Sequence, residues 1–140
     1  MDWKKIKCVM IVDSAMSPGL IANTTAILGI TLGKLMPELV GNAVRDQSNN
    51  EHEGIIALPV PILREGPERL RDIRAALLQP EFQDITSVDF TDVAQGCRSY
   101  DEFIEKMGRC PESSLQYLAL ALCGPRKKVN RLTGSLPLLR

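Results

Sequence analysis

The C-terminal run of the chain, residues 118–139 (LALALCGPRKKVNRLTGSLPLL), most constrains its fold. It opens with a continuous apolar stretch, which predicts a buried strand. A Gly-Pro pair at 124–125 breaks that strand, and Val129 and Leu132 then lie three residues apart in a basic segment, as on one face of a helix. A Thr-Gly pair at 133–134 stops the helix, and the apolar residues that follow predict a chain end packed against the core.

Upstream of this run, strand-like and helix-like segments alternate. Ser17 and Pro18 supply a cap and a first-turn proline for a long apolar helix, whereas Pro59 and Pro61 remove hydrogen-bond donors and mark an edge strand. The polar residues 41–54 are expected to form a surface excursion. The expected strands are residues 6–12, 54–63, 85–90 and 116–122. The expected helices are residues 19–36, 68–78 (Leu70, Ile73, Leu77 and Leu78 inward), 100–106 (with Phe103, Ile104 and Met107 inward) and the basic stretch before Thr133.

This order predicts one α/β domain over residues 1–140, with parallel strand pairs in a mixed sheet and helices on both faces. Ligand sites in such sheets form beyond the carboxyl ends of the parallel strands. That rule places residues 13–23, after the first strand, close to residues 91–98, after the third. We therefore expect the functional site to lie between these two segments, and we call this place the mouth.

Composition excludes several classes of protein. Seventeen basic residues balance seventeen acidic ones, so no overall field draws the chain toward nucleic acid or a membrane surface. Five Arg or Lys residues and no acidic residue do fall within residues 124–140. Lys127, Lys128 and Arg131 are either the solvated face of the last helix or contacts to a phosphate backbone.

Cysteine usage and hydropathy point to a reduced, soluble setting. The four cysteines form no CxxC pair, and His52 is the single histidine, so neither a metal nor a cofactor is expected. Cys8 and Cys123 lie in apolar runs as core residues. No signal-peptide apolar region opens the chain, and residues 20–36 are too polar to span a bilayer. These features predict a cytoplasmic protein without a membrane partner, and they leave its oligomeric state open.

Three segments carry a family resemblance: SPGLIAN (17–23), VDFTDVAQGCR (88–98) and the closing CGP…VNRLTGSL (123–136). The chain resembles a family of small proteins of unknown function that share the fold of the type II peptidyl-tRNA hydrolases, from residue 7 to the end. The resemblance implies a three-layer α/β/α domain on a four-stranded mixed sheet whose last strand is antiparallel to the rest.

Only some of the functional residues of these hydrolases are present in this chain. Where those enzymes have their catalytic lysine this chain has Leu20, and Thr24 and Ile27 occupy the positions of their glutamine and histidine. Their Asp-Ala-Gly loop corresponds to Asp92-Val-Ala. Gly124, Pro125, Thr133 and Gly134 match their closing motif, and these four read as structural. Without the lysine, the usual peptidyl-tRNA hydrolysis is not expected.

Five residues at the mouth are the candidate site. Asp92 and Cys97 are the catalytic candidates: Asp92 follows a strand, and Arg98 next to Cys97 could favour its thiolate. Asn23, Gln95 and Arg98 are the ligand-binding candidates. Each has a structural alternative, in which Asp92 caps a turn, Asn23 only hydrogen-bonds locally and Arg98 pairs with a neighbouring acid.

Three functions remain open. The first is a module that binds a small or RNA-related ligand at the mouth. The second is a non-catalytic regulatory domain that kept the scaffold. The third is a hydrolase with a rearranged site using Asp92 or Cys97, for which a Cys97–His52–Asp92 arrangement is one form.

Overall fold

The computed structural model describes residues 2–140 and has a four-stranded sheet at its centre. The sheet contains β4 (Ile62–Glu65), β1 (Ile6–Asp13), β6 (Tyr117–Pro125) and β5 (Thr86–Thr91), in that spatial order. β1 is parallel to β4, and β6 runs antiparallel to both β1 and β5. The expected mixed α/β sheet is confirmed, with the last strand antiparallel to the others.

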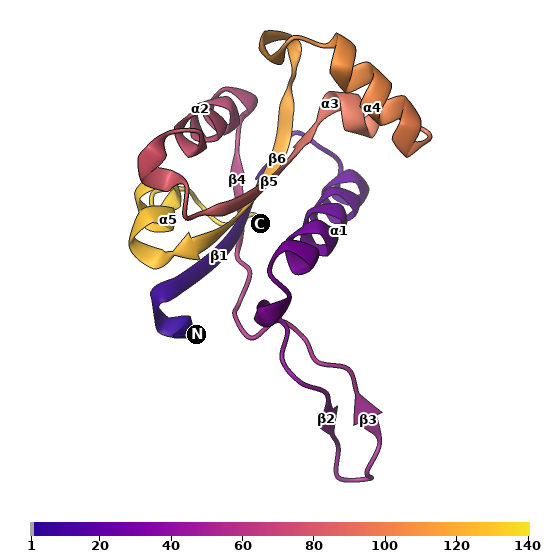
Figure 1. Cartoon of the computed structure of the whole chain (residues 1–140), viewed down its shortest axis with the longest axis vertical. Helices are drawn as coiled ribbons and strands as arrows, with labels where there is room; N and C mark the ends of the chain where they lie inside the picture. The colour runs from indigo at the N-terminus through magenta and orange to yellow at the C-terminus, as the bar shows by residue number, and fades with distance from the viewer. Residues whose placement is uncertain (1) are drawn as a thin grey trace.

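Helices cover both faces of this sheet (Figure 1). α1 (Pro18–Leu35) packs on one face against Cys8, Met10 and Val12 of β1. α2 (Pro67–Leu77) and α5 (Arg126–Thr133) pack on the other, against Val9 and Ile11. Because successive side chains of a strand point to opposite faces, the apolar run of β1 serves both cores. The short α3 (Asp92–Gln95) and α4 (Tyr100–Arg109) follow β5 at the end of the sheet.

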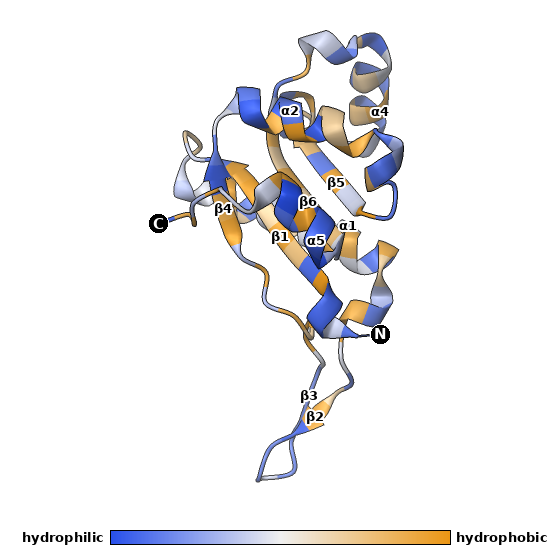
Figure 2. Ribbon diagram, turned by 90° about the vertical axis from the view of Figure 1, so that its left-hand side faces the viewer, coloured by the Kyte–Doolittle hydropathy of each residue, from blue (hydrophilic) through white to orange (hydrophobic). Residues whose placement is uncertain are grey.

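The C-terminal tail closes one edge of the sheet. Arg64 N donates to Pro137 O (3.0 Å), and Leu139 N donates to Ile62 O (2.8 Å), along the outer side of β4. The tail therefore packs as expected, and it also pairs with the strand that the prolines marked as an edge. Figure 2 shows the contrast between the largely hydrophobic β1 and the largely hydrophilic α5.

Residues 41–54 form a projecting ribbon, which we call the arm. Its two short strands, β2 (Val44–Arg45) and β3 (Glu51–His52), pair only with each other and extend away from the body (Figure 1). At its base a Cβ on Gly54 would lie 1.8 Å from the carbonyl oxygen of Gly41, so this close crossing requires glycine. The expected surface excursion is confirmed, but as an ordered ribbon.

The structure corrects four details of the sequence prediction. The second strand begins only at Ile62, after both prolines, and runs on to Glu65. Leu78, expected inward, caps the end of α2 and is 61% exposed. Ile104 is 57% exposed because α4 lies beyond the sheet rather than over it. β6 continues through Pro125, so the Gly-Pro pair forms the last two residues of the strand rather than following it. Within residues 2–140, no helix is long and apolar enough to cross a bilayer.

Candidate functional site

The carboxyl ends of β1, β4 and β5 meet at one edge of the sheet, as the topology rule predicts. Asp13 and Glu65 are register partners at this edge, and Thr91 ends β5 there. Two hollows open near it: a polar cleft beside α2 and an apolar pocket beside α1. The hollow that offers a free charged group to a ligand is the stronger candidate for the site.

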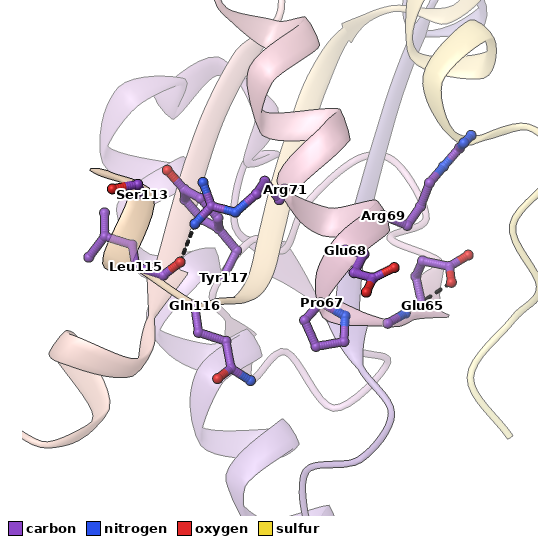
Figure 3. Close-up of a pocket in the computed structure, with 10 residues that line it drawn as sticks. Glu65, Pro67, Glu68, Arg69, Arg71, Ser113, Leu115, Gln116 and Tyr117 are labelled. Carbon is purple, nitrogen blue, oxygen red and sulfur yellow. Dashed lines mark hydrogen bonds between the residues drawn. The ribbon is translucent and has the colours of Figure 1, made fainter. Parts of the chain in front are cut away.

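The polar cleft, of about 680 Å³, lies between the start of α2 and the residues that lead into β6 (Figure 3). Its most prominent cation, Arg71, is fully engaged. It donates to the two carboxylate oxygens of Glu112 (2.7 and 2.8 Å) and to Leu115 O, and it lies 5.3 Å from the ring centre of Tyr117.

Tyr117 and Glu65 of the cleft are also hydrogen-bonded. Tyr117 donates to Glu112 (3.2 Å), and burial, followed by the nearby Glu112 charge, raises the pKa of Tyr117. Glu65 accepts from Gly66 N (2.9 Å). The side chains of Arg69 and Gln116 point away from Arg71 in Figure 3. The cleft therefore holds the loop before β6 against α2, and its central cation, Arg71, is not free to bind a ligand.

The apolar pocket, of about 460 Å³, lies between α1, β5 and the α3–α4 segment. This volume is in the usual range for a small-molecule site. Leu28 and Phe90 are buried in its floor, whereas Arg98 and Tyr100 are exposed at its edge. The other residues that line it are Ile27, Thr31, Val88, Asp89, Ala94, Cys97, Ser99 and Phe103.

Two of the predicted site residues, Cys97 and Arg98, share this pocket. Cys97 Sγ donates to Val93 O (3.1 Å), and Arg98 N donates to Glu102 Oε2 (2.9 Å). These bonds fix the backbone of the loop between α3 and α4. Within residues 2–140 the Arg98 guanidinium has no carboxylate within ion-pair distance, so its charge is available to a ligand.

The loop that carries Arg98 is expected to respond to acid through Glu102. A hydrogen bond from Lys106, together with that from the Arg98 amide, holds the pKa of Glu102 below its usual value of 4.5. A lowered pKa means that the stabilisation is present above pH 4.5 and is lost as the pH falls through the lowered value. We expect the NMR shift of the Arg98 amide to titrate with a midpoint below 4.5.

Two variants separate this contact from general acid effects. Glu102→Gln should abolish the titration of the Arg98 amide, since the amide would no longer bond to a carboxylate. Glu105→Gln is the matched control, because Glu105 pairs with Arg109 on the same helix and does not touch the loop. A midpoint at or above 4.5 in the wild-type protein would contradict the assignment.

The other three predicted site residues line neither hollow. Asp92 is tied to the residue before β6: its N donates to Gln116 O, and its Oδ1 accepts from Gln116 N, each at 3.0 Å. Asn23 is exposed on the outer face of α1, and Gln95 is exposed at the end of α3. The structure thus brings Cys97 and Arg98 together and leaves Asp92, Asn23 and Gln95 outside their pocket.

The arrangement of Cys97 with His52 and Asp92 is not formed. His52 lies on the arm, where its Nε2 is 2.8 Å from Asp46 Oδ2, and this contact lowers the pKa of Asp46. Among residues 2–140 no cluster of three His, Cys, Asp or Glu side chains could hold a metal ion.

Sequence reasoning missed the aromatic walls of the pocket and all of the polar cleft. Phe90 and Phe103 read simply as core residues, because apolar periodicity does not separate a core side chain from one that lines a pocket. The cleft was missed because the second strand was placed too early, so Glu65 and Gly66 were not recognised as a strand end at the mouth.

Comparison with known proteins gives a family and a fold. Residues 6–140 match the family described as protein of unknown function DUF2000. No curated protein matches the chain. A solved structure of a protein of unknown function from Agrobacterium tumefaciens strain C58 is similar, with a TM-score of 0.86 and 20% identity over 97% of this chain and 98% of that one. At such identity the likeness shows the fold alone. The family match confirms the expected family of unknown function: the chain belongs to the DUF2000 family.

Proposed function

We propose that this chain is a ligand-binding domain that takes a small amphipathic anion into the apolar pocket between α1, β5 and the α3–α4 segment. The observation that carries the proposal is the pairing of an apolar floor with one unpaired cation, Arg98, at the edge. Such a pocket binds an apolar body by desolvation and fixes its orientation through a charged end.

The choice of pocket follows from which polar groups are free. In the polar cleft, Arg71 already has a carboxylate, two carbonyls and an aromatic ring as partners, and the side chain of Arg69 points away from Arg71 (Figure 3). In the apolar pocket, Asp89 is neutralised by Arg74, whose Nε lies 3.6 Å from its carboxylate. Arg98 therefore gives the pocket a net positive edge, which favours a carboxylate or phosphate group on the ligand.

Titration calorimetry with octanoate, a carboxylate with a short apolar chain, tests the proposal. We expect saturable binding that weakens roughly 10-fold in Arg98→Leu, because a hydrogen bond to a charged group contributes about 1.5 kcal/mol. Neutral octanol should bind the wild-type protein and Arg98→Leu equally. Arg109→Leu is the matched control, since Arg109 lies at the far end of α4 and pairs with Glu105. No binding of octanoate, or equal binding by Arg98→Leu, would refute the proposal.

A hydrolase using Cys97 is a second candidate, and one observation favours it. Cys97 is half-buried in the lining of the apolar pocket, directly before the exposed Arg98, so its thiol lies beside the space that a bound ester would occupy. Asp92 would act beside the thiol only through the Gln116 loop. Turnover of a thiol-sensitive ester that is lost in Cys97→Ser would favour this candidate over simple binding.

We also propose that the chain is related to the type II peptidyl-tRNA hydrolases at the level of fold. This relationship is supported by the mixed sheet with an antiparallel last strand and by the closing Gly-Pro and Thr-Gly pairs. Leu20, at the position of the hydrolase lysine, is 40% exposed on α1. This apolar side chain replaces the cation that would act on an ester, which supports binding without peptidyl-tRNA hydrolysis. A cytoplasmic location is part of the same proposal.

A further inference from the structure

The outer face of α1 is unusual for a helix exposed to solvent. From Pro18 to Gly33 it contains no charged residue, and the first charge is Lys34. Surface helices normally carry charged residues opposite their buried stripe, whereas a helix that is apolar all round is buried on both sides. Leu20 is 40% exposed, Ile30 75% and Leu35 54%. The inner face, with Thr24, Leu28 and Leu32, is already packed on the sheet.

The arm continues this exposed surface. It leaves the body just after α1 and projects past the end of that helix (Figure 1). Val40 is 47% exposed and Ile55 80% at the base of the arm, and Val44 is 59% exposed within it, so exposed apolar side chains continue from the end of α1 onto the arm. An isolated two-stranded ribbon is only marginally stable in water, which makes a projecting ordered arm most useful when it packs against something else.

We propose that this surface joins two copies of the chain in a dimer, with the α1 helices antiparallel across a two-fold axis and each arm lying along the other copy. In that arrangement the arm, which begins where α1 ends, reaches the start of the other copy's α1. The two helix dipoles oppose each other, which is the favourable orientation for adjacent helices.

Charge favours a second copy as the occupant. A two-fold axis sets the same patch against itself, so a charged face would repel its copy, and this face has no charge before Lys34. The arm carries Arg45 against the acids Asp46, Glu51 and Glu53, and is therefore net acidic. The first turn of α1 has no acidic residue, and the positive end of its dipole, capped by Ser17, favours the approach of the acidic arm.

Asn23 gains a role in this arrangement. It is a polar residue in the second turn of an otherwise largely apolar outer face, and its amide has both donors and an acceptor. With the two-fold axis near Ile30, Asn23 lies about seven residues from the axis, where it can hydrogen-bond to the backbone that leads into the other copy's arm. This role would account for an exposed Asn23 that lies outside the ligand pocket.

The area required shows why the arm must take part. An α1 of 18 residues is about 27 Å long and about 10 Å wide, so it offers roughly 300 Å². A stable interface needs about 800 Å² from each partner. The helix face alone falls short, and the arm supplies the remaining surface.

Sedimentation of the full chain tests the proposal. The wild-type protein is expected to sediment at twice its 15.5 kDa at micromolar concentration. Ile30→Glu sets like charges together near the axis and should weaken the dimer roughly 100-fold. Ile104→Glu is the matched control, because Ile104 is similarly exposed on α4, outside the surface. Ile30 is chosen rather than Ile27, which also lines the ligand pocket.

Replacing residues 43–53 by a short Gly-Ser turn should also give a monomer. When the same replacement is made in the monomeric Ile30→Glu protein, the midpoint of its urea unfolding should not change. Normal circular dichroism of each variant shows that dissociation is not unfolding. A wild-type protein that stays monomeric at hundreds of micromolar would overturn the proposal, and so would an Ile30→Glu protein that dimerises as tightly as Ile104→Glu. Octanoate binding by monomeric Ile30→Glu shows whether the pocket works independently of the dimer.

Discussion

Deletion of residues 136–140 is expected to lower the free energy of unfolding by roughly 3 kcal/mol. The tail makes two backbone hydrogen bonds to β4 and inserts Leu136 and Leu139, both half-buried, into the two cores. A half-buried leucine contributes about 1 kcal/mol and a hydrogen bond about 1 kcal/mol, less the cost of ordering the tail. Urea unfolding followed by circular dichroism measures the change.

The same deletion should also promote aggregation. It uncovers the outer edge of β4, where unpaired N–H and C=O groups can pair with another chain. Light scattering at rising protein concentration detects this effect. Removal of Arg140 alone is the matched control and should change stability by less than about 0.5 kcal/mol. If the longer deletion costs no more than that control, the tail does not close the fold.

Gly124→Ala is expected to cost roughly 1–3 kcal/mol, because its new Cβ meets fixed backbone. Gly124 is buried in β6, and a Cβ there would lie 2.9 Å from Ile85 Cα and 3.0 Å from Asp84 O. Backbone atoms cannot rotate away as the end of a flexible side chain can, so the strands must move apart. Thermal and urea unfolding both measure the loss.

Gly108→Ala gives the opposite sign and controls for the added methyl group. Gly108 lies in α4, and a Cβ there meets nothing within 4 Å. Alanine is favoured over glycine within a helix by about 0.5–1 kcal/mol, so this variant should be slightly more stable than the wild type. Equal effects of the two substitutions would show that β6 does not approach Ile85 as closely as the structure has it.

The sheet was predictable where apolar patterning is unambiguous. β1 and β6 are continuous apolar runs, and such runs belong to central strands with both faces buried. β4 was placed too early because its apolar lead-in contains the prolines, while the strand itself ends in the polar pair Arg64 and Glu65. The sequence of the arm has no apolar periodicity, so its strands could not be predicted. Local contacts, such as that of Asp46 with His52, hold the ribbon together.

The candidate site was predictable only in part. The topology rule correctly named the edge where Cys97 and Arg98 lie, because that edge follows from strand order alone. Which side chains share a pocket depends on how α3 and α4 fold back beside α1. That placement depends on long-range packing, and a short polar segment around Gly96 contains little sequence signal for it.

NMR mapping of octanoate binding tests the central claim most directly. Backbone amide shifts should change in three separate segments that meet only in the folded pocket: residues 27–31 of α1, residues 88–90 of β5 and residues 97–103. The Arg98→Leu protein should show the same pattern at higher octanoate concentration. Shifts confined to residues 65–71 and 113–117, around the polar cleft, or to the basic α5 would contradict the account.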